Sequence, residues 1–102
     1  MIIRYKNAAL RDIQQKQDYI ANVLKNKKAA QNLVSSILRT VSQLMDNPMM
    51  GVPLNSKFDV DSDLRFFIIS KQLAFYRIED ESVISVVRML DGRQDYMSIL
   101  FE

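Results

Sequence analysis

Three short runs rich in β-branched and aromatic residues follow one another in the last third of the chain. They span residues 65–69, 73–78 and 83–90, and only the polar breaks Ser70-Lys71 and Asp80-Glu81 separate them. Runs of this composition, joined by so few residues, are typical of strands connected by tight hairpins. We therefore expect an antiparallel meander of three strands in this part of the chain.

The first half of the chain has the periodicity of two helices. A β-prone run at residues 2–5 precedes Asn7, which we expect to cap a helix that reaches about Lys25. Asn26 can end this helix and cap a second one, whose apolar residues follow the spacing of an amphipathic helix. Those apolar residues are Ala30, Leu33, Val34, Ile37, Val41, Leu44 and Met45.

The second predicted helix ends at Asn47-Pro48, because the residue before a proline avoids the α region. Residues 48–63 then form a loop that contains both prolines and Gly51. A loop of this length in a small domain is often functional. The alternative is a surface connection held down by its own apolar side chains, Met49, Met50, Leu54 and Phe58.

Length and composition limit the class of protein. The 102 residues fit one domain, residues 1–102, and no segment approaches the roughly 20 apolar residues of a membrane span. Nothing after Met1 resembles a secretion signal. The chain has no cysteine and no histidine, which removes thiolate chemistry, soft-metal sites and the usual imidazole base. We expect a cytoplasmic protein without metal or cofactor.

The third predicted strand is apolar on both faces. Alternation places Val83, Val87 and Met89 on one face and Ile84, Val86 and Leu90 on the other. Such a strand needs cover on both sides, whereas two helices readily cover only one face of a small sheet. The other face is therefore either a shallow groove or a surface for a partner.

Four arginines lie on or beside the predicted strands: Arg65, Arg77, Arg88 and Arg93. The planar guanidinium suits phosphate and carboxylate geometry, so a convergent pair could hold a phosphate or an acidic partner. Because the strand register is unknown, the alternative stays open that they form surface salt bridges. The available carboxylates are Asp63, Glu79, Asp91 and Asp95.

Tyr96 follows Arg93 by three residues. Its hydroxyl could donate a proton, or act as a base if nearby cations favour the phenolate. Arg88 and Arg93 are the candidates for those cations. The alternative is a tyrosine at the rim of the core that packs its ring against the protein and leaves its hydroxyl in water.

A set of individually weak matches runs in a fixed order along nearly the whole chain: Tyr19-Ile20, Ala29-Ala30, Pro48, Gly51 with Leu54, Asp63 with Arg65, and Gly92-Arg93-x-Asp95-Tyr96. With the predicted order β-α-α-β-β-β, these residues make the chain similar to the RelE/ParE family of toxins from bacterial type II toxin–antitoxin (addiction, or plasmid-stabilisation) modules. The resemblance implies an α+β fold in which a helical hairpin packs on a small antiparallel sheet.

The resemblance implies one of two activities. RelE-like members cut mRNA in the decoding site of the ribosome, and ParE-like members poison DNA gyrase without being enzymes. On the first hypothesis, which we place slightly ahead, Tyr96, Arg88 and Arg93 are the catalytic residues, and the RNA 2′-hydroxyl attacks the adjacent phosphate. Arg65 and Arg77 then position the RNA backbone. A third hypothesis is a catalytically silent module that only binds antitoxin.

The resemblance also implies a cognate antitoxin, encoded next to this chain, that wraps the toxin. We assign Val83, Val87 and Met89 to its binding surface, because they form an apolar face without predicted cover. The other expected partners are the ribosome and mRNA or, alternatively, DNA gyrase. Two features depart from RelE-like sites: Lys71 is the only lysine of the predicted sheet region, and Asp91 stands where many relatives carry histidine.

Overall fold

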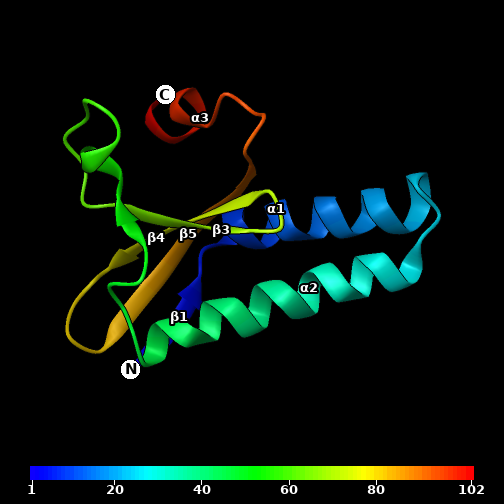
Figure 1. Ribbon diagram of the computed structural model, residues 1–102, viewed down its shortest axis with the longest axis horizontal. Helices are drawn as coiled ribbons and strands as arrows, with labels where there is room; N and C mark the ends of the chain where they lie inside the picture. Colours follow the sequence, from blue (N-terminus) through cyan, green and yellow to red (C-terminus); the bar gives the residue numbers. More distant parts are fainter.

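Five strands form one sheet in the order β1-β5-β4-β3-β2 (Figure 1). The computed structural model describes residues 1–102. The strands are β1 (Ile2–Tyr5), β2 (Val52–Pro53), β3 (Arg65–Ile69), β4 (Gln72–Ile78) and β5 (Val83–Asp91). The antiparallel meander of β3, β4 and β5 is confirmed. However, β1 pairs parallel to β5, so the sheet is mixed rather than wholly antiparallel.

A helical hairpin covers one face of the sheet, which confirms the predicted α+β architecture. Its segments are α1 (Asn7–Asp18), the π-helical turn η1 (Tyr19–Val23), α2 (Lys27–Ser42) and the 3-10 turn η2 (Gln43–Met45). The far end of the hairpin, around η1, projects beyond the sheet (Figure 1). None of the helices has the length and apolar character needed to cross a membrane.

The ends of the helices agree only in part with those predicted from the sequence. Asn26 caps α2 as predicted, since its side-chain oxygen accepts a hydrogen bond of 2.9 Å from the N–H of Ala29. The predicted cap at Asn7 is wrong: Asn7 is the first residue of α1, and Lys6 occupies the cap position without a side-chain hydrogen bond. The chain passes directly from β1 into α1, with the Lys6 N–H still bonded to the Val86 carbonyl of β5.

The turn between β3 and β4 explains why this hairpin is so tight. Ser70 and Lys71 both have positive φ, 47° and 70°. Two consecutive residues of this kind form the turn whose twist matches that of the flanking strands. The β4–β5 connection is longer, residues 79–82, and closes through a hydrogen bond from the Glu79 N–H to the Val83 carbonyl.

A β-bulge in β5 overturns the predicted alternation of its side chains. Tyr76 of β4 lies opposite Val86, and the preceding Phe75 lies opposite Arg88, so Val87 is an extra residue without a partner. An extra residue shifts all later side chains to the other face of the sheet. The predicted faces are therefore wrong for Met89, which lies in the core on the helix side, and for Leu90, which lies in the core on the opposite side.

Each face of the sheet packs into a separate hydrophobic core. The core on the helix side contains Ala9, Ile13, Ile37, Val41, Leu44, Ile69, Ala74, Tyr76, Ile84, Val86 and Met89. The core on the opposite side contains Leu54, Leu64, Leu73, Phe75 and Leu90.

The second face is covered, contrary to the expectation of an open surface. Phe58 and Val60, from the segment between the 3-10 turn η3 (Leu54–Ser56) and β3, pack over it. The short helix α3 (Tyr96–Phe101) lies over the same face and contributes Tyr96, Met97, Ile99 and Leu100 (Figure 1). The long loop therefore acts as part of the core, and the sheet has helical or loop cover on both sides.

Candidate functional site

The structure does not bring the four arginines to one site. Arg65 binds the backbone of the long loop: its Nε and Nη2 donate to the Gly51 carbonyl at 3.1 and 2.7 Å, and Nη2 also donates to the Met49 carbonyl. Arg77 forms an ion pair of 2.8 Å with Asp63. Arg65 thus holds the loop against the sheet, and Arg77 is paired with Asp63 at the surface.

Tyr76 fastens the same loop from the neighbouring strand. Its buried hydroxyl donates to the Pro48 carbonyl at 2.7 Å and accepts from the Gly51 N–H at 2.9 Å. Gly51 has no room for a side chain, because an added Cβ would lie 2.6 Å from Tyr76 Cε1 and 2.9 Å from the Phe66 carbonyl oxygen. Pro48 and Gly51 were noted in the sequence as part of the long loop and as family matches, and the structure shows that Tyr76 holds the backbone of both.

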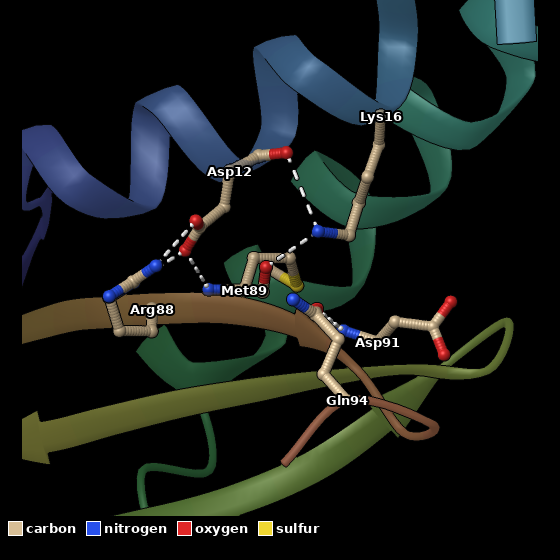
Figure 2. Close-up of polar contacts among 6 residues, drawn as sticks. All are labelled: Asp12, Lys16, Arg88, Met89, Asp91 and Gln94. Carbon is tan, nitrogen blue, oxygen red and sulfur yellow. Dashed lines mark hydrogen bonds and ion pairs between the residues drawn. The ribbon is translucent and has the colours of Figure 1, made fainter. Parts of the chain in front are cut away.

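Arg88 is held by a buried carboxylate on α1. Arg88 Nε and Nη2 donate to the two oxygens of Asp12 at 2.7 and 2.8 Å, and the Asp12 side chain is only 8% exposed. The same carboxylate accepts a 2.9 Å hydrogen bond from the N–H of Met89. Hydrogen bonding to Asp12 raises the pKa of Arg88. Figure 2 shows Asp12 pointing from the helix to the strand.

These contacts close an open edge of the sheet. β1 pairs with β5 only as far as Val86, so the rest of this edge has no neighbouring strand. Lys16, one turn after Asp12 on α1, donates to the Met89 carbonyl at 2.8 Å, and Gln94 accepts from the Asp91 N–H at 2.7 Å (Figure 2). Burial lowers the pKa of Lys16, although Asp12 and Asp91 oppose the shift. Side chains thus bond the backbone groups that a neighbouring strand would otherwise pair. Arg88 contributes by holding the Asp12 carboxylate in place.

Arg93 is bound to Asp91 at the end of β5. Its Nε and Nη2 donate to the two carboxylate oxygens, each at 3.0 Å, and its backbone N–H donates to Oδ1 at 2.8 Å. The hydrogen bond from the Arg93 side chain is the main reason that the pKa of Asp91 lies well below its ordinary value. The Arg93 side chain is nevertheless 87% exposed. Arg77–Asp63 and Arg93–Asp91 are two of the predicted surface salt bridges; Arg88–Asp12 was not foreseen.

Tyr96 takes the packing role that was the alternative to catalysis. It is the first residue of α3, which Asp95 caps by accepting from the Ser98 N–H. Its ring packs edge-on against Phe58 and tilted against Phe75, with centroids 6.0 and 5.6 Å apart. No hydrogen bond or ion pair joins Tyr96 to Arg88 or Arg93. The structure does not assemble these three into one site, and their catalytic roles stay predictions.

The predicted antitoxin surface needs a correction. Met89 is fully buried in the core on the helix side, because the bulge at Val87 turns it inward, so it cannot contact a partner. Val87 is half-buried and packs against the second core. Val83 is half-buried next to Ile2 of β1. These three residues do not form an open apolar face.

A groove that sequence reasoning missed lies between the projecting end of the helical hairpin and the end of the sheet. It has a volume of about 580 Å³. Its lining residues are Gln15, Lys16, Tyr19, Ile20, Leu24, Leu33, Gln72, Asp91, Arg93 and Gln94. A second hollow of about 400 Å³ shares Ile20, Leu33 and Gln72 with it. The hollows depend on how the hairpin is placed over the sheet, for which the sequence carries no local signal.

Comparison with known proteins gives a consistent result. The family model for the ParE toxin of the type II toxin–antitoxin system parDE matches residues 3–96. A solved structure described as the chromosomal ParDE TA system from P. aeruginosa has a TM-score of 0.73 at 19% identity and covers 89% of this chain and 95% of its own. YafQ from E. coli strain BL21(DE3) has a TM-score of 0.56 at 13% identity and covers 99% and 98%. At such identities the solved structures show the fold alone. No curated protein matches the chain.

Proposed function

Because the chain belongs to the ParE family of toxins from type II toxin–antitoxin systems, we propose that it stops bacterial growth by acting on DNA gyrase rather than by cleaving mRNA. The family membership predicted from the sequence is confirmed, and it implies a cognate antitoxin as partner. The choice between the two targets rests on whether Arg88 and Arg93 are free to bind a phosphate or are held by carboxylates.

The observation that carries the proposal is the neutralisation of Arg88 by Asp12. A site that cleaves RNA needs cations aimed at the phosphate and a group for proton transfer within hydrogen-bonding reach. Here both oxygens of a buried carboxylate bind Arg88, and Tyr96 packs among Phe58 and Phe75. Releasing Arg88 would leave the Asp12 carboxylate buried without its partner, which costs several kcal/mol, about 3–5. A toxin that acts by binding a protein target needs no such release.

Ribosome-dependent mRNA cleavage remains the second candidate because of Arg93. Its side chain is exposed, and its pair with Asp91 lies at the surface, where an ion pair contributes little to stability. A phosphate of an RNA backbone could therefore take Arg93 from Asp91 at small cost. On this candidate Arg93 contributes to the chemistry, and Arg88 does not have to move.

Controlled expression in bacteria tests the proposal. New DNA and new protein are pulse-labelled after induction, with and without co-expression of the adjacent open reading frame. Early loss of DNA synthesis supports action on gyrase, whereas early loss of protein synthesis supports mRNA cleavage and contradicts the proposal. Arrest that the adjacent frame relieves supports the antitoxin partner. No arrest at all would favour a silent module that only binds antitoxin.

Two substitutions sharpen the same experiment. Tyr96→Phe removes only a hydroxyl, and Arg93→Ala removes the one exposed cation of the predicted catalytic set. A nuclease that uses these groups in the transition state would lose most of its rate in both variants, with little change in folding or antitoxin binding. We expect the arrest by Tyr96→Phe to be unchanged.

A further inference from the structure

The outer half of the helical hairpin, residues 14–32, carries the positive charge of the protein. Its charged side chains are four lysines and one carboxylate: Lys16, Lys25, Lys27, Lys28 and Asp18. The net charge of this segment is therefore +3, whereas that of the whole chain is +2, so the remaining residues are together slightly negative. The end of this segment projects beyond the sheet, where a large partner can reach it (Figure 1).

Three of these lysines have no partner within the protein. Lys16 bonds the backbone of β5, but the exposed Lys25, Lys27 and Lys28 form neither an ion pair nor a side-chain hydrogen bond. Lys27 and Lys28 lie in the first turn of α2, which contains no acidic residue. The dipole of a helix disfavours cations in its first turn, so these two lysines do not stabilise the helix. They are free to bind an anionic partner.

Many of the carboxylates gather at the opposite end of the molecule. Six of the twelve lie in the segment before β3 and in the turn between β4 and β5: Asp59, Asp61, Asp63, Glu79, Asp80 and Glu81. Figure 1 shows both segments at the end away from the tip of the hairpin, in a molecule 39 Å long. A protein polarised in this way presents its positive end to a polyanion and keeps its negative end away from it.

Amide side chains accompany the lysines. Seven of the 19 residues in the outer half of the hairpin are glutamine or asparagine. A third hollow, of about 300 Å³ between the two helices, is lined by Lys27 and by four of these amides: Gln14, Gln17, Asn22 and Gln31. Gln14 donates to Asp18, whereas the other three amides have no hydrogen-bond partner. An amide offers both donors and an acceptor, the combination that pairs with the edge of a base.

We propose that the outer half of the hairpin binds double-stranded DNA. Lys25, Lys27 and Lys28 bind phosphates of the backbone, and Asn22 and Gln31 bond to base edges. The phosphate contacts supply most of the affinity, and the base contacts add sequence preference. Carboxylates of an acidic protein surface would bind the lysines but offer the amides acceptors only. The choice of DNA rests on the proposed function, since gyrase acts on DNA.

Fluorescence anisotropy of a short labelled DNA duplex, titrated with the purified full-length protein, tests the inference. One variant combines Lys25→Gln, Lys27→Gln and Lys28→Gln. It should bind at least tenfold more weakly than the wild-type protein at low salt. Each lost phosphate contact should also reduce the slope of log affinity against log salt by about 0.9, so the three together reduce it by about 2–3.

The matched control removes three exposed lysines from other parts of the protein, by Lys6→Gln, Lys57→Gln and Lys71→Gln in one chain. Both triple variants have the same net charge, so a general effect of charge would weaken them equally. We expect the control to keep the affinity and the salt slope of the wild-type protein. Thermal unfolding checks that each variant is folded.

A second pair of variants tests the amides. Asn22→Ala with Gln31→Ala should weaken binding to a preferred duplex at least about fivefold, the value of a base-edge contact, and leave the salt slope unchanged. Gln43→Ala is the control, because Gln43 is an exposed amide in η2 at the other end of α2. It should bind as the wild-type protein does.

The outcomes separate this inference from the proposed function. No binding of the duplex at low salt, an equal loss in both triple variants, or tighter binding of an RNA duplex of the same sequence would each overturn the inference. If the hairpin variant binds DNA normally but no longer blocks supercoiling, the hairpin contacts gyrase itself and the inference is wrong. If the wild-type protein binds DNA through the hairpin while gyrase works normally in its presence, the inference stands and the proposed function fails.

Discussion

Asp12 and Arg88 lie 76 positions apart in the chain and meet through two hydrogen bonds of 2.7 and 2.8 Å. The helix that carries Asp12 packs along the part of β5 that β1 leaves unpaired. Asp12 also accepts a hydrogen bond from the Met89 N–H. One carboxylate therefore binds both the Arg88 guanidinium and a backbone N–H at the unpaired edge of β5. An edge covered in this way cannot pair with a strand from another chain.

Asp12→Ala should therefore destabilise the protein strongly. It leaves the Met89 N–H and the Arg88 guanidinium without their acceptor, and loss of one partner of a part-buried pair costs about 3 kcal/mol. Urea unfolding measures the difference. Asp18→Ala is the control, since Asp18 is exposed and only accepts from Gln14; a similar loss in both variants would contradict the account.

Gly51→Ala should destabilise the protein by about 1–3 kcal/mol, the usual cost of overpacking. The added methyl would clash with the Tyr76 ring and with the Phe66 carbonyl. Gly92→Ala should change stability by less than about 0.5 kcal/mol, because its Cβ would meet only the Lys71 carbonyl oxygen at 3.5 Å. Equal unfolding midpoints for the two variants would show that the loop is not packed as described.

The two tyrosines should respond differently to loss of the hydroxyl. Tyr76→Phe leaves the Gly51 N–H and the Pro48 carbonyl unpaired and should cost about 1–3 kcal/mol. Tyr96→Phe keeps the ring contacts with Phe58 and Phe75 and should have an effect within about 0.5 kcal/mol. Thermal or urea unfolding compares them, and a large loss in Tyr96→Phe would reveal a role for its hydroxyl beyond packing.

Stability should fall in acid partly through Asp91. Its pKa is lower in the folded protein than in the unfolded chain, chiefly because Arg93 binds it. The resulting stabilisation is complete above the unfolded pKa, about 4, and is lost as the pH falls below that value. Asp91→Asn should thus be less stable than wild type at pH 7, and the difference should shrink below about pH 4. A difference that stays constant down to pH 2 would contradict this assignment; Arg93→Gln should behave as Asp91→Asn does.

The sequence predicts a strand well where its composition and its turn residues indicate the same boundary. β3 is predicted to the residue, because β-branched and aromatic residues end at the Ser70-Lys71 break. The bulge at Val87 has no such signal, since apolar residues of β5 occupy both alternating sets of positions and do not show where the alternation breaks. One unpaired residue was enough to exchange the faces of the residues after it. The cover of the second face was missed because residues 48–63, with Leu54 and Phe58, were expected to form a loop, and no helix was predicted after β5.

The candidate site was less predictable than the fold. Arginine positions are visible in the sequence, but their partners depend on packing between distant segments. Arg93 pairs with a carboxylate two residues away, whereas the carboxylate of Arg88 comes from α1. The groove at Gln72 is likewise made by the position of the hairpin over the sheet. The toxin assignment follows from the family resemblance. The pairing of Arg88 with Asp12 is the reason that we propose gyrase rather than mRNA as the target.

Supercoiling of DNA by purified gyrase, in the presence of this protein and without ribosomes, tests the central claim most directly. We predict that the protein blocks supercoiling or causes cleaved DNA to accumulate, and that the cognate antitoxin reverses the effect. Normal supercoiling with the protein in stoichiometric excess, together with cleavage of mRNA in a translating extract, would contradict the account.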